Sequence, residues 1–306
     1  MFDNASVGGV RDAAPFLRHT QWTVSSAKML YFPGKMGYDR ENACRVSPNG
    51  GYPMNNKKLQ KILYWVVMAI FSTVFVVSAV LLVRYAISTF QGRQIFSEIA
   101  AMHTTSATGS DSDSPILEEL QTIHELNNDV VGWIRIEGTN IDYPVMQTPQ
   151  DSDYYLHTSF YHEYSNEGCI YVRGACDLLT PSDNVTIYGH NMLNGSMFRN
   201  LHKYKEQSFY EKHKYIQFDT LYERHTYEII AVFQTSGTYG KGFAYHLFDD
   251  AVDEAAFDSF VATCRELSLY SIETTAHYGD KLITLSTCDK TALENGRLAV
   301  VAKRIS

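Results

Sequence analysis

One cysteine and one arginine flank a short connection between two apolar segments near the C-terminus. Cys288 ends the segment KLITLSTC, and Arg297 begins the segment RLAVVAKRI. Alternation along KLITLSTC puts Cys288 at the end of a predicted strand, where side chains become accessible. If the two segments pair as antiparallel strands, the loop 289–296 brings Arg297 opposite Cys288. A guanidinium there can favour the thiolate and donate to the oxyanion that forms when a thiolate attacks a carbonyl.

A histidine with complementary chemistry lies upstream, in the segment NVTIYGHNM, where His190 follows Gly189 at another predicted strand end. An imidazole beside a cysteine can hold a thiolate as an ion pair and protonate a leaving amine. Periodicity does not show that His190 reaches Cys288, because most single cysteines are buried apolar residues. The chain also has eleven histidines. Alternation puts Tyr188 on the face of its strand that carries His190, and Ser286 on the face that carries Cys288.

The chain has five cysteines, so at least one thiol has no intramolecular partner. Cys169 lies in a strand pattern and Cys264 in a helical pattern, and we expect both to be packing residues. Cys176, in the turn GACDLL, is the one rival nucleophile by expected exposure. The sequence has no CxxC pair, zinc-finger spacing or calcium-loop spacing, and it therefore indicates no metal and no cofactor.

The elements that must position these side chains lie in residues 116–306. The segment ILEELQTIHELNN has apolar residues at helical spacing and predicts an opening helix. From Val130 the pattern changes to short strands: GWIRI, IDYPVMQ, GCIYVRG, NVTIYGH, YIQFDT, TYEIIAVFQT, KLITLSTC and RLAVVAKRIS. One helix interrupts them at 249–267, with an acidic first turn that suits the helix dipole. Short strands separated by turns predict a mainly β domain, an antiparallel barrel or a sandwich.

Residues 62–83 form a run of 22 residues without a charge, ILYWVVMAIFSTVFVVSAVLLV. As a helix it spans about 33 Å, which is enough to cross a membrane. It lacks the polar stripe of a core helix, and Arg84 follows it where a signal peptide would have a cleavage site of small residues. Lysines precede the run at 57, 58 and 61. The positive-inside rule therefore predicts a cytoplasmic N-terminus and an extracytoplasmic C-terminal domain on a single-pass anchor.

The remaining segments are polar or irregular. Residues 1–61 are predicted to be a disordered cytoplasmic tail, of which 1–53 is alternatively a misassigned start, because Met54 begins a stretch typical of signal anchors. Residues 84–115 are predicted to be a juxtamembrane segment and a polar linker, rich in Ser, Thr and Asp from 103 onward. A formal charge of −8 argues against nucleic acid as a partner.

These motifs together resemble the catalytic signature of sortases, cysteine transpeptidases that attach proteins to the cell wall of Gram-positive bacteria. LITLSTC, with Arg297 after it and IYGHNM before it, resembles the strand that carries the family's nucleophile. The segments DVVGWIRIEGTNIDYPVMQ, DYYLHTSF, MFRNLHKY, HKYIQFDT and GRLAVVAKRI resemble class B sortases in particular. The resemblance covers 116–306. It implies a closed β-barrel of about eight strands, with N-terminal helices and one long late helix, behind a single transmembrane helix.

The resemblance also implies a role for each residue. Cys288 would attack the Thr carbonyl in the C-terminal sorting motif of a secreted protein. His190 would protonate the leaving amine and deprotonate the incoming one, and Arg297 would stabilise the oxyanion. The acyl-enzyme would be resolved by an amine of the cell-wall precursor lipid II or by a pilin lysine. Substrate contacts are expected from Tyr188, Ser286, Thr287 and Asp289, although Asp289 is equally well explained by an Asx turn at the start of the loop.

Two other functions fit part of the pattern. A cell-wall cysteine peptidase or amidase would also use a thiol and an imidazole. Such enzymes typically place Cys before His in the chain and complete the site with Asp, Asn or His, whereas here the order is His190, Cys288, Arg297. A non-catalytic surface module on a membrane anchor would explain the apolar run and the β-rich domain. It would not explain why TLSTC, GHN and GR occur together.

Overall fold

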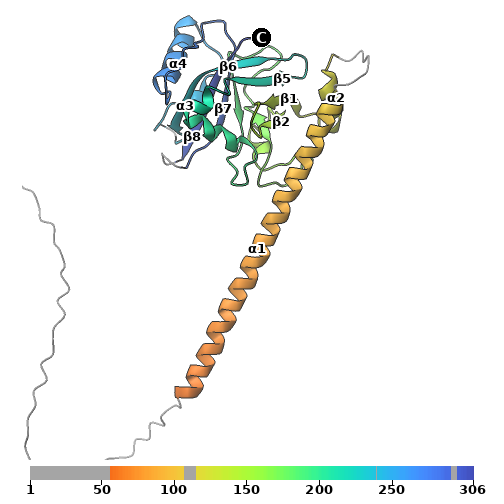
Figure 1. Cartoon of the computed structure of the whole chain (residues 1–306), viewed down its shortest axis with the longest axis vertical. Coiled ribbons are helices and arrows are strands. Elements are labelled where there is room, and N and C mark those ends of the chain that lie inside the picture. The colour runs from red at the N-terminus through yellow and green to blue at the C-terminus, as the bar shows by residue number, and fades with distance from the viewer. Residues whose placement is uncertain (1–55, 107–114, 239, 291–294) are drawn as a thin grey trace, which may run out of the picture. The chain divides into compact units, whose positions relative to one another are not determined.

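The computed structural model describes residues 56–106, 115–238, 240–290 and 295–306. The predicted tail at 1–53 and most of the predicted linker, at 107–114, lie outside the described residues. The chain divides into two units, Met1–Gln60 and Lys61–Ser306. The second unit contains a closed β-barrel, drawn in Figure 1.

The longest helix, α1 (Asn56–Ser106), has 51 residues and contains the whole apolar run 62–83. That run is almost entirely exposed, and the helix is long and apolar enough to cross a membrane. The polar sequence from 103 predicted a linker, but the helix continues to Ser106. It contains no proline, so nothing in its sequence forces a break between the apolar run and its C-terminal end.

The C-terminal part of α1 packs on the barrel. Phe96 and Ile99 belong to the main hydrophobic core. The ring of Phe96 meets Tyr143 edge-on at 5.4 Å between centroids. The imidazole of His103 stacks on Trp133 at 4.1 Å. The core of the barrel domain therefore includes residues of α1 that precede the predicted boundary at 116.

Eight strands form the barrel in the described part of the chain, which confirms the mainly β prediction. They are β1 (Val130–Arg135), β2 (Asp142–Met146), β3 (Ile170–Val172), β4 (Asn184–Tyr188), β5 (Tyr215–Thr220), β6 (Thr226–Ser236), β7 (Leu282–Cys288) and β8 (Gly296–Arg304). Their order around the barrel is β1-β2-β3-β4-β7-β8-β6-β5, closed by the pairing of β1 with β5.

The strand pattern had suggested an antiparallel barrel or a sandwich, but the barrel is not wholly antiparallel. Two pairs are parallel, β2 with β3 and β4 with β7. In the second pair Tyr188, the last residue of β4, lies opposite Ser286 near the end of β7. Because parallel strands run in the same direction, the segments that follow β4 and β7 emerge at one edge of the barrel.

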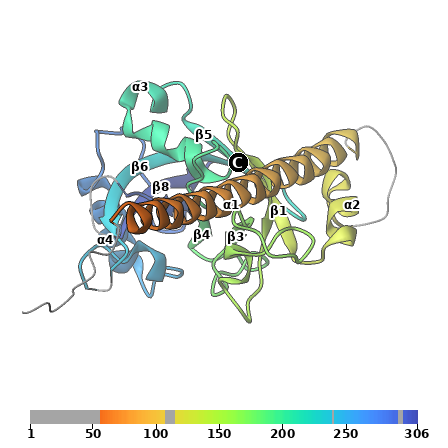
Figure 2. The ribbon, with the colours of Figure 1, turned by 90° about the horizontal axis from the view of Figure 1, so that it is seen from below.

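The helices around the barrel differ in detail from the prediction. The opening helix α2 (Glu118–Leu126) buries Leu120 and Ile123 as expected. The late helix α4 (Glu254–Glu266) is shorter than the predicted 249–267, because the Asp253 side chain accepts the Ala256 N–H and caps it there. Figures 1 and 2 show α2 and α4 on opposite sides of the barrel. The short helices are η1 (Tyr154–Leu156), η2 (Phe198–Lys205), α3 (Gln207–Tyr210) and η3 (Tyr245–Leu247).

Candidate active site

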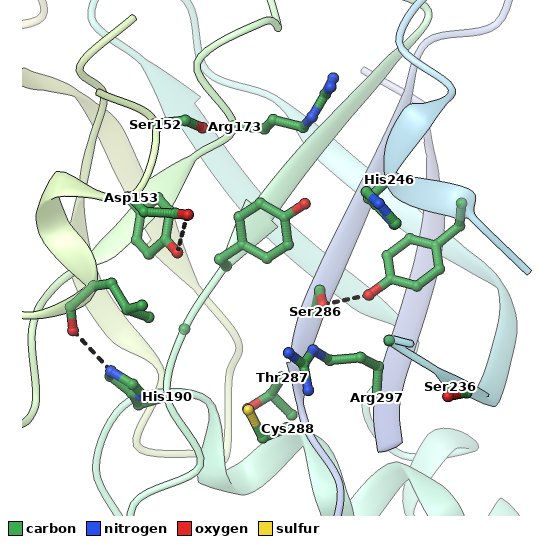
Figure 3. A pocket seen from close by; sticks show the side chains of 16 residues that line it. Ser152, Asp153, Arg173, His190, Ser236, His246, Ser286, Thr287, Cys288 and Arg297 are labelled. Atoms are coloured by element: carbon green, nitrogen blue, oxygen red, sulfur yellow. Dashed lines mark hydrogen bonds between the residues drawn. The ribbon is translucent and has the colours of Figure 1, made fainter. Parts of the chain in front are cut away.

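The β7–β8 hairpin pairs Cys288 directly with Arg297. This register confirms the hairpin predicted from the sequence. The Arg297 guanidinium donates to the Asn295 side chain at 3.1 Å and to the Gly296 carbonyl at 3.2 Å, which holds it at the mouth of the hairpin. In Figure 3 the guanidinium reaches across toward β7, beside Thr287 and Cys288.

The chain after β4 brings His190 to the same edge of the barrel. The Gly189 N–H donates to the Ser286 carbonyl at 3.1 Å, so the pairing of β4 with β7 extends one residue beyond β4. A Cβ atom at position 189 would lie 2.5 Å from Ile170 Cδ1 and 2.7 Å from the Phe198 ring. Glycine is therefore the residue that fits there, and it lets the chain that leads to His190 run beside the end of β7.

Cys288, His190 and Arg297 line one cavity of about 370 Å³ (Figure 3). Three of the four expected substrate contacts line it as well, namely Tyr188, Ser286 and Thr287. Alternation had put Thr287 on the opposite face from Cys288, but the cavity surrounds the end of β7 and therefore reaches both faces. The sequence did not single out the remaining walls, which are Ser152, Asp153, Leu156, Tyr171, Arg173, Gly189, Ser236, Gly237, Tyr245 and His246.

His190 is held by backbone at the rim of this cavity. Its Nε2 lies 2.8 Å from the Leu156 carbonyl, which can only accept, so Nε2 carries the proton. Burial lowers the pKa of His190, the hydrogen bond to Leu156 raises it, and the neighbouring His157 lowers it further. Within the described residues no hydrogen bond joins His190 to the Cys288 thiol. In the view of Figure 3, Cys288 lies between His190 and Arg297.

A second group of side chains binds the backbone of the cysteine. Asn191 Nδ2 donates to the Cys288 carbonyl at 2.9 Å, and His202 Nε2 lies 3.1 Å from the same oxygen. Arg199 donates to Asn191 Oδ1 at 2.9 Å, which sets the orientation of the amide. Because Asn191 follows His190 directly, its bond to the Cys288 carbonyl connects the chain after β4 to the end of β7. Sequence reasoning missed Asn191, although it belongs to the GHN motif.

The fourth expected substrate contact, Asp289, does not line the cavity. Its side chain is buried and its carboxylate pairs with Lys205 Nζ at 2.7 Å and accepts from Gln234. Its backbone N–H donates to the Gly296 carbonyl at 2.8 Å and continues the hairpin ladder. The carboxylate is therefore occupied within the fold by Lys205 and Gln234.

The other described cysteines are buried and free: Cys169, Cys176 and Cys264. Burial raises the pKa of all three thiols, that of Cys176 to about 12. The exposure that made Cys176 a rival nucleophile is absent, and Cys288 is the only described cysteine that is partly exposed. Cys44 lies outside the described residues. Among these residues no group of three or more His, Cys, Asp or Glu side chains could hold a metal ion.

Comparison with known proteins decides the family. The family model described as the Sortase domain matches residues 134–305. This chain belongs to the sortase family. A sortase B of Listeria monocytogenes serovar 1/2a (strain ATCC BAA-679 / EGD-e) is 31% identical over 215 residues, which cover 69% of this sortase and 84% of the relative.

Solved structures agree with this assignment. The Staphylococcus aureus sortase B–substrate complex matches with a TM-score of 0.64 at 26% identity, over 72% of this sortase and 99% of that chain. A sortase B complexed with triglycine matches with a TM-score of 0.63 at 26% identity, over 71% and 100% of the two chains. The expected class B assignment is thereby confirmed, and membership in this family makes the protein a cysteine transpeptidase.

Proposed function

We propose that this sortase cleaves a C-terminal sorting motif of secreted proteins after its Thr and transfers the acyl group to an amine of the cell-wall precursor. The observation that carries the proposal is the convergence of Cys288, His190 and Arg297 on one cavity at the shared edge of β4, β7 and β8. The ligands of the two solved relatives, a substrate and triglycine, support a peptide donor and an amine acceptor.

The proposed reaction exchanges one amide bond for another through a thioester. The Cys288 proton passes to His190, and Sγ attacks the Thr carbonyl while Arg297 donates to the oxyanion. The peptide C–N bond breaks as His190 returns the proton to the leaving amine. An incoming amine then loses a proton to His190 and attacks the thioester. The C–S bond breaks, and His190 returns the proton to the Cys288 thiolate. With Nε2–H bonded to Leu156, Nδ1 is the nitrogen left for these transfers.

Tyr188, Ser286 and Thr287 are proposed as substrate contacts because all three line the cavity. Thr287 Oγ1 is buried and has no hydrogen-bond partner within the described structure, so it is available to a bound peptide. The Ser286 hydroxyl pairs with the Tyr245 hydroxyl at 2.6 Å. We assign Tyr245 the role of orienting Ser286 toward the substrate.

The apolar part of α1, residues 62–83, is proposed as the membrane anchor, with the preceding lysines on the cytoplasmic side and the barrel outside. This topology favours lipid II, a membrane-bound precursor, as the source of the acceptor amine. A pilin lysine is the alternative acceptor, and a direct comparison of the two amines distinguishes them.

The test uses a quenched sorting-signal peptide with triglycine as acceptor. Cys288→Ala should abolish cleavage and the thioacyl adduct seen by mass spectrometry, whereas Cys176→Ala, the matched control, should retain both. Arg297→Ala should lower the rate by about 10²–10³ if it is the main oxyanion donor. Activity that persists in Cys288→Ala would refute the proposal. A peptidase or amidase would give hydrolysis without a triglycine product, and a non-catalytic module would give no adduct.

A further inference from the structure

The distance along α1 between the apolar run and the barrel is short. The run ends at Val83, and the next half-buried residues of the helix are Ser88 and Thr89. Ser88 lies five positions after Val83 in the helix, a rise of about 7.5 Å. The headgroup layer beyond the hydrocarbon core is about 5–7 Å thick on each side. If 62–83 spans the bilayer, as proposed above, the barrel begins at the outer edge of the headgroup layer.

Two loops of the barrel meet the part of α1 that follows the apolar run. The first is the segment 157–167, because residues 88–98 of α1 and residues 159–165 line a shared cavity of about 320 Å³. The second is the segment 191–197, because the Arg93 guanidinium donates to the Asn194 carbonyl at 2.5 Å. Asn194 also joins the loops by donating to the Glu167 carboxylate at 2.5 Å. We call these two segments the membrane-proximal loops.

Both membrane-proximal loops present large apolar or aromatic side chains to solvent. Tyr164 is 78% exposed and Leu193 is 87% exposed, and Tyr161 beside them is also exposed. Single exposed apolar residues are common on any protein surface. Tyr164, however, lines a cavity with Ser88 and Gln91 of α1, and Tyr85 and Phe90 in the same part of the helix are exposed too. Tyrosine and apolar side chains are favourable at the boundary between hydrocarbon and water.

The same loops adjoin the catalytic cavity. Segment 191–197 begins directly after His190, and segment 157–167 begins directly after Leu156, whose carbonyl holds that imidazole. The Tyr164 ring lies 6.2 Å from the His157 ring, which in turn lies 5.5 Å from the His190 ring. Any surface that these two loops contact would therefore lie beside the catalytic cavity.

We propose that the membrane-proximal loops bind the outer lipid surface through Tyr164 and Leu193, so that the catalytic cavity is held beside the headgroups. The occupant of this surface is the bilayer that contains α1. An amine carried on a lipid headgroup then reaches the thioester without leaving the membrane plane. The lipid contact rests on the proposed anchor, and its consequence for the acceptor rests on the proposed transfer reaction.

The test places a tryptophan on each loop of the full chain in phosphatidylcholine vesicles. Tyr164→Trp and Leu193→Trp should gain fluorescence that is quenched by lipids brominated near the headgroup end of the acyl chain. Leu179→Trp is the matched control, since Leu179 is about as exposed as Tyr164, at 77%, but lies on another part of the barrel. It lines a cavity with Leu221. The Leu221 carbonyl accepts the N–H of Leu117, the residue before α2. Tryptophan at 179 should escape quenching.

The parent chain supplies an internal reference, because Trp65 lies in the apolar run. If Trp65 is quenched but tryptophans at 164 and 193 are quenched no more than the one at 179, the lipid contact is overturned and the transfer reaction still stands. Absence of quenching at Trp65 would overturn the anchor and the lipid contact together.

A second measurement uses turnover. Leu193→Asp should slow transfer to a vesicle lipid that carries a triglycine headgroup and should leave transfer to soluble triglycine unchanged, whereas Leu179→Asp should affect neither. An equal effect of Leu193→Asp on both acceptors would contradict a role for the loop at the membrane.

Discussion

Replacement of Ile99 by alanine tests whether α1 is part of the barrel core. Ile99 is completely buried in the core cluster that contains Phe96 and Trp133. Deletion of the buried methyl and methylene groups of an Ile side chain typically costs about 2–5 kcal/mol, the transfer free energy plus the cavity left behind. A domain of this size is stable by about 5–15 kcal/mol, so Ile99→Ala should remove a large share of the free energy of unfolding.

The chain offers a matched control on the same helix. Ile87 is 52% exposed and lies twelve positions earlier, so Ile87→Ala changes the same side chain outside the core. Its effect should stay within about 0.5 kcal/mol. Both variants are compared in a soluble chain that begins at Arg84, by urea unfolding followed by fluorescence. The urea concentration at the midpoint of unfolding should fall for Ile99→Ala and remain the same for Ile87→Ala. The slope of the free energy of unfolding against urea concentration should be unchanged in both.

Equal midpoints for the two variants would refute a role for α1 in the core. The barrel domain would then fold without α1, and its boundary would lie near residue 116 as the sequence suggested. If α1 does belong to the core, a soluble chain that begins at 107 should be less stable than Ile99→Ala, because it loses Phe96 together with Ile99.

Three further predictions concern the site and its surroundings. Asp289→Ala removes a buried carboxylate that pairs with Lys205 and accepts from Gln234, and it should destabilise the fold by about 1–3 kcal/mol in urea unfolding; weaker peptide binding at unchanged stability would contradict this. Asn191→Ala removes a donor from the Cys288 carbonyl and should lower kcat by about tenfold, with a smaller change in KM; an unchanged kcat would show that the bond does not position the thiol. Burial lowers the pKa of His103 below its ordinary 6.5, so the unfolded chain takes up a proton that the fold resists, and stability should fall as the pH drops from 7.5 to 5. His103→Phe keeps the stack on Trp133 and should reduce that fall, and equal slopes in the two chains would count against it.

Local patterns were sufficient for much of the fold. Strand alternation and intervening turns predicted the strands, because both depend on neighbours in the sequence. The pairing of Cys288 with Arg297 was also predictable, since a short loop leaves two adjacent strands few other registers. Of the apolar residues at helical spacing, Ile116, Leu120, Ile123 and Leu126, the two in the middle are buried in α2, whereas Leu126 at its end is exposed.

Two contacts in the structure could not be read from the sequence, for a common reason. The polar segment from 103 suggested that the membrane helix and the barrel are separate, yet His103 stacks on Trp133 and the residues before it enter the core. The position of Asp289 beside the nucleophile suggested contact with substrate, yet its carboxylate pairs with Lys205. In both cases the partner lies far away in the sequence, and polarity alone does not reveal it.

The sequence by itself determined which groups are available for catalysis and that each stands at the end of a strand or hairpin. It also determined the apolar run, because length and lack of charge are local properties. Only the tertiary structure decided that His190 and Cys288 line one cavity. Their strands are separated by about half of the barrel domain in the sequence, yet β4 and β7 pair in parallel and end at one edge. That pairing depends on how all eight strands pack around one core, and no periodicity within either strand specifies it.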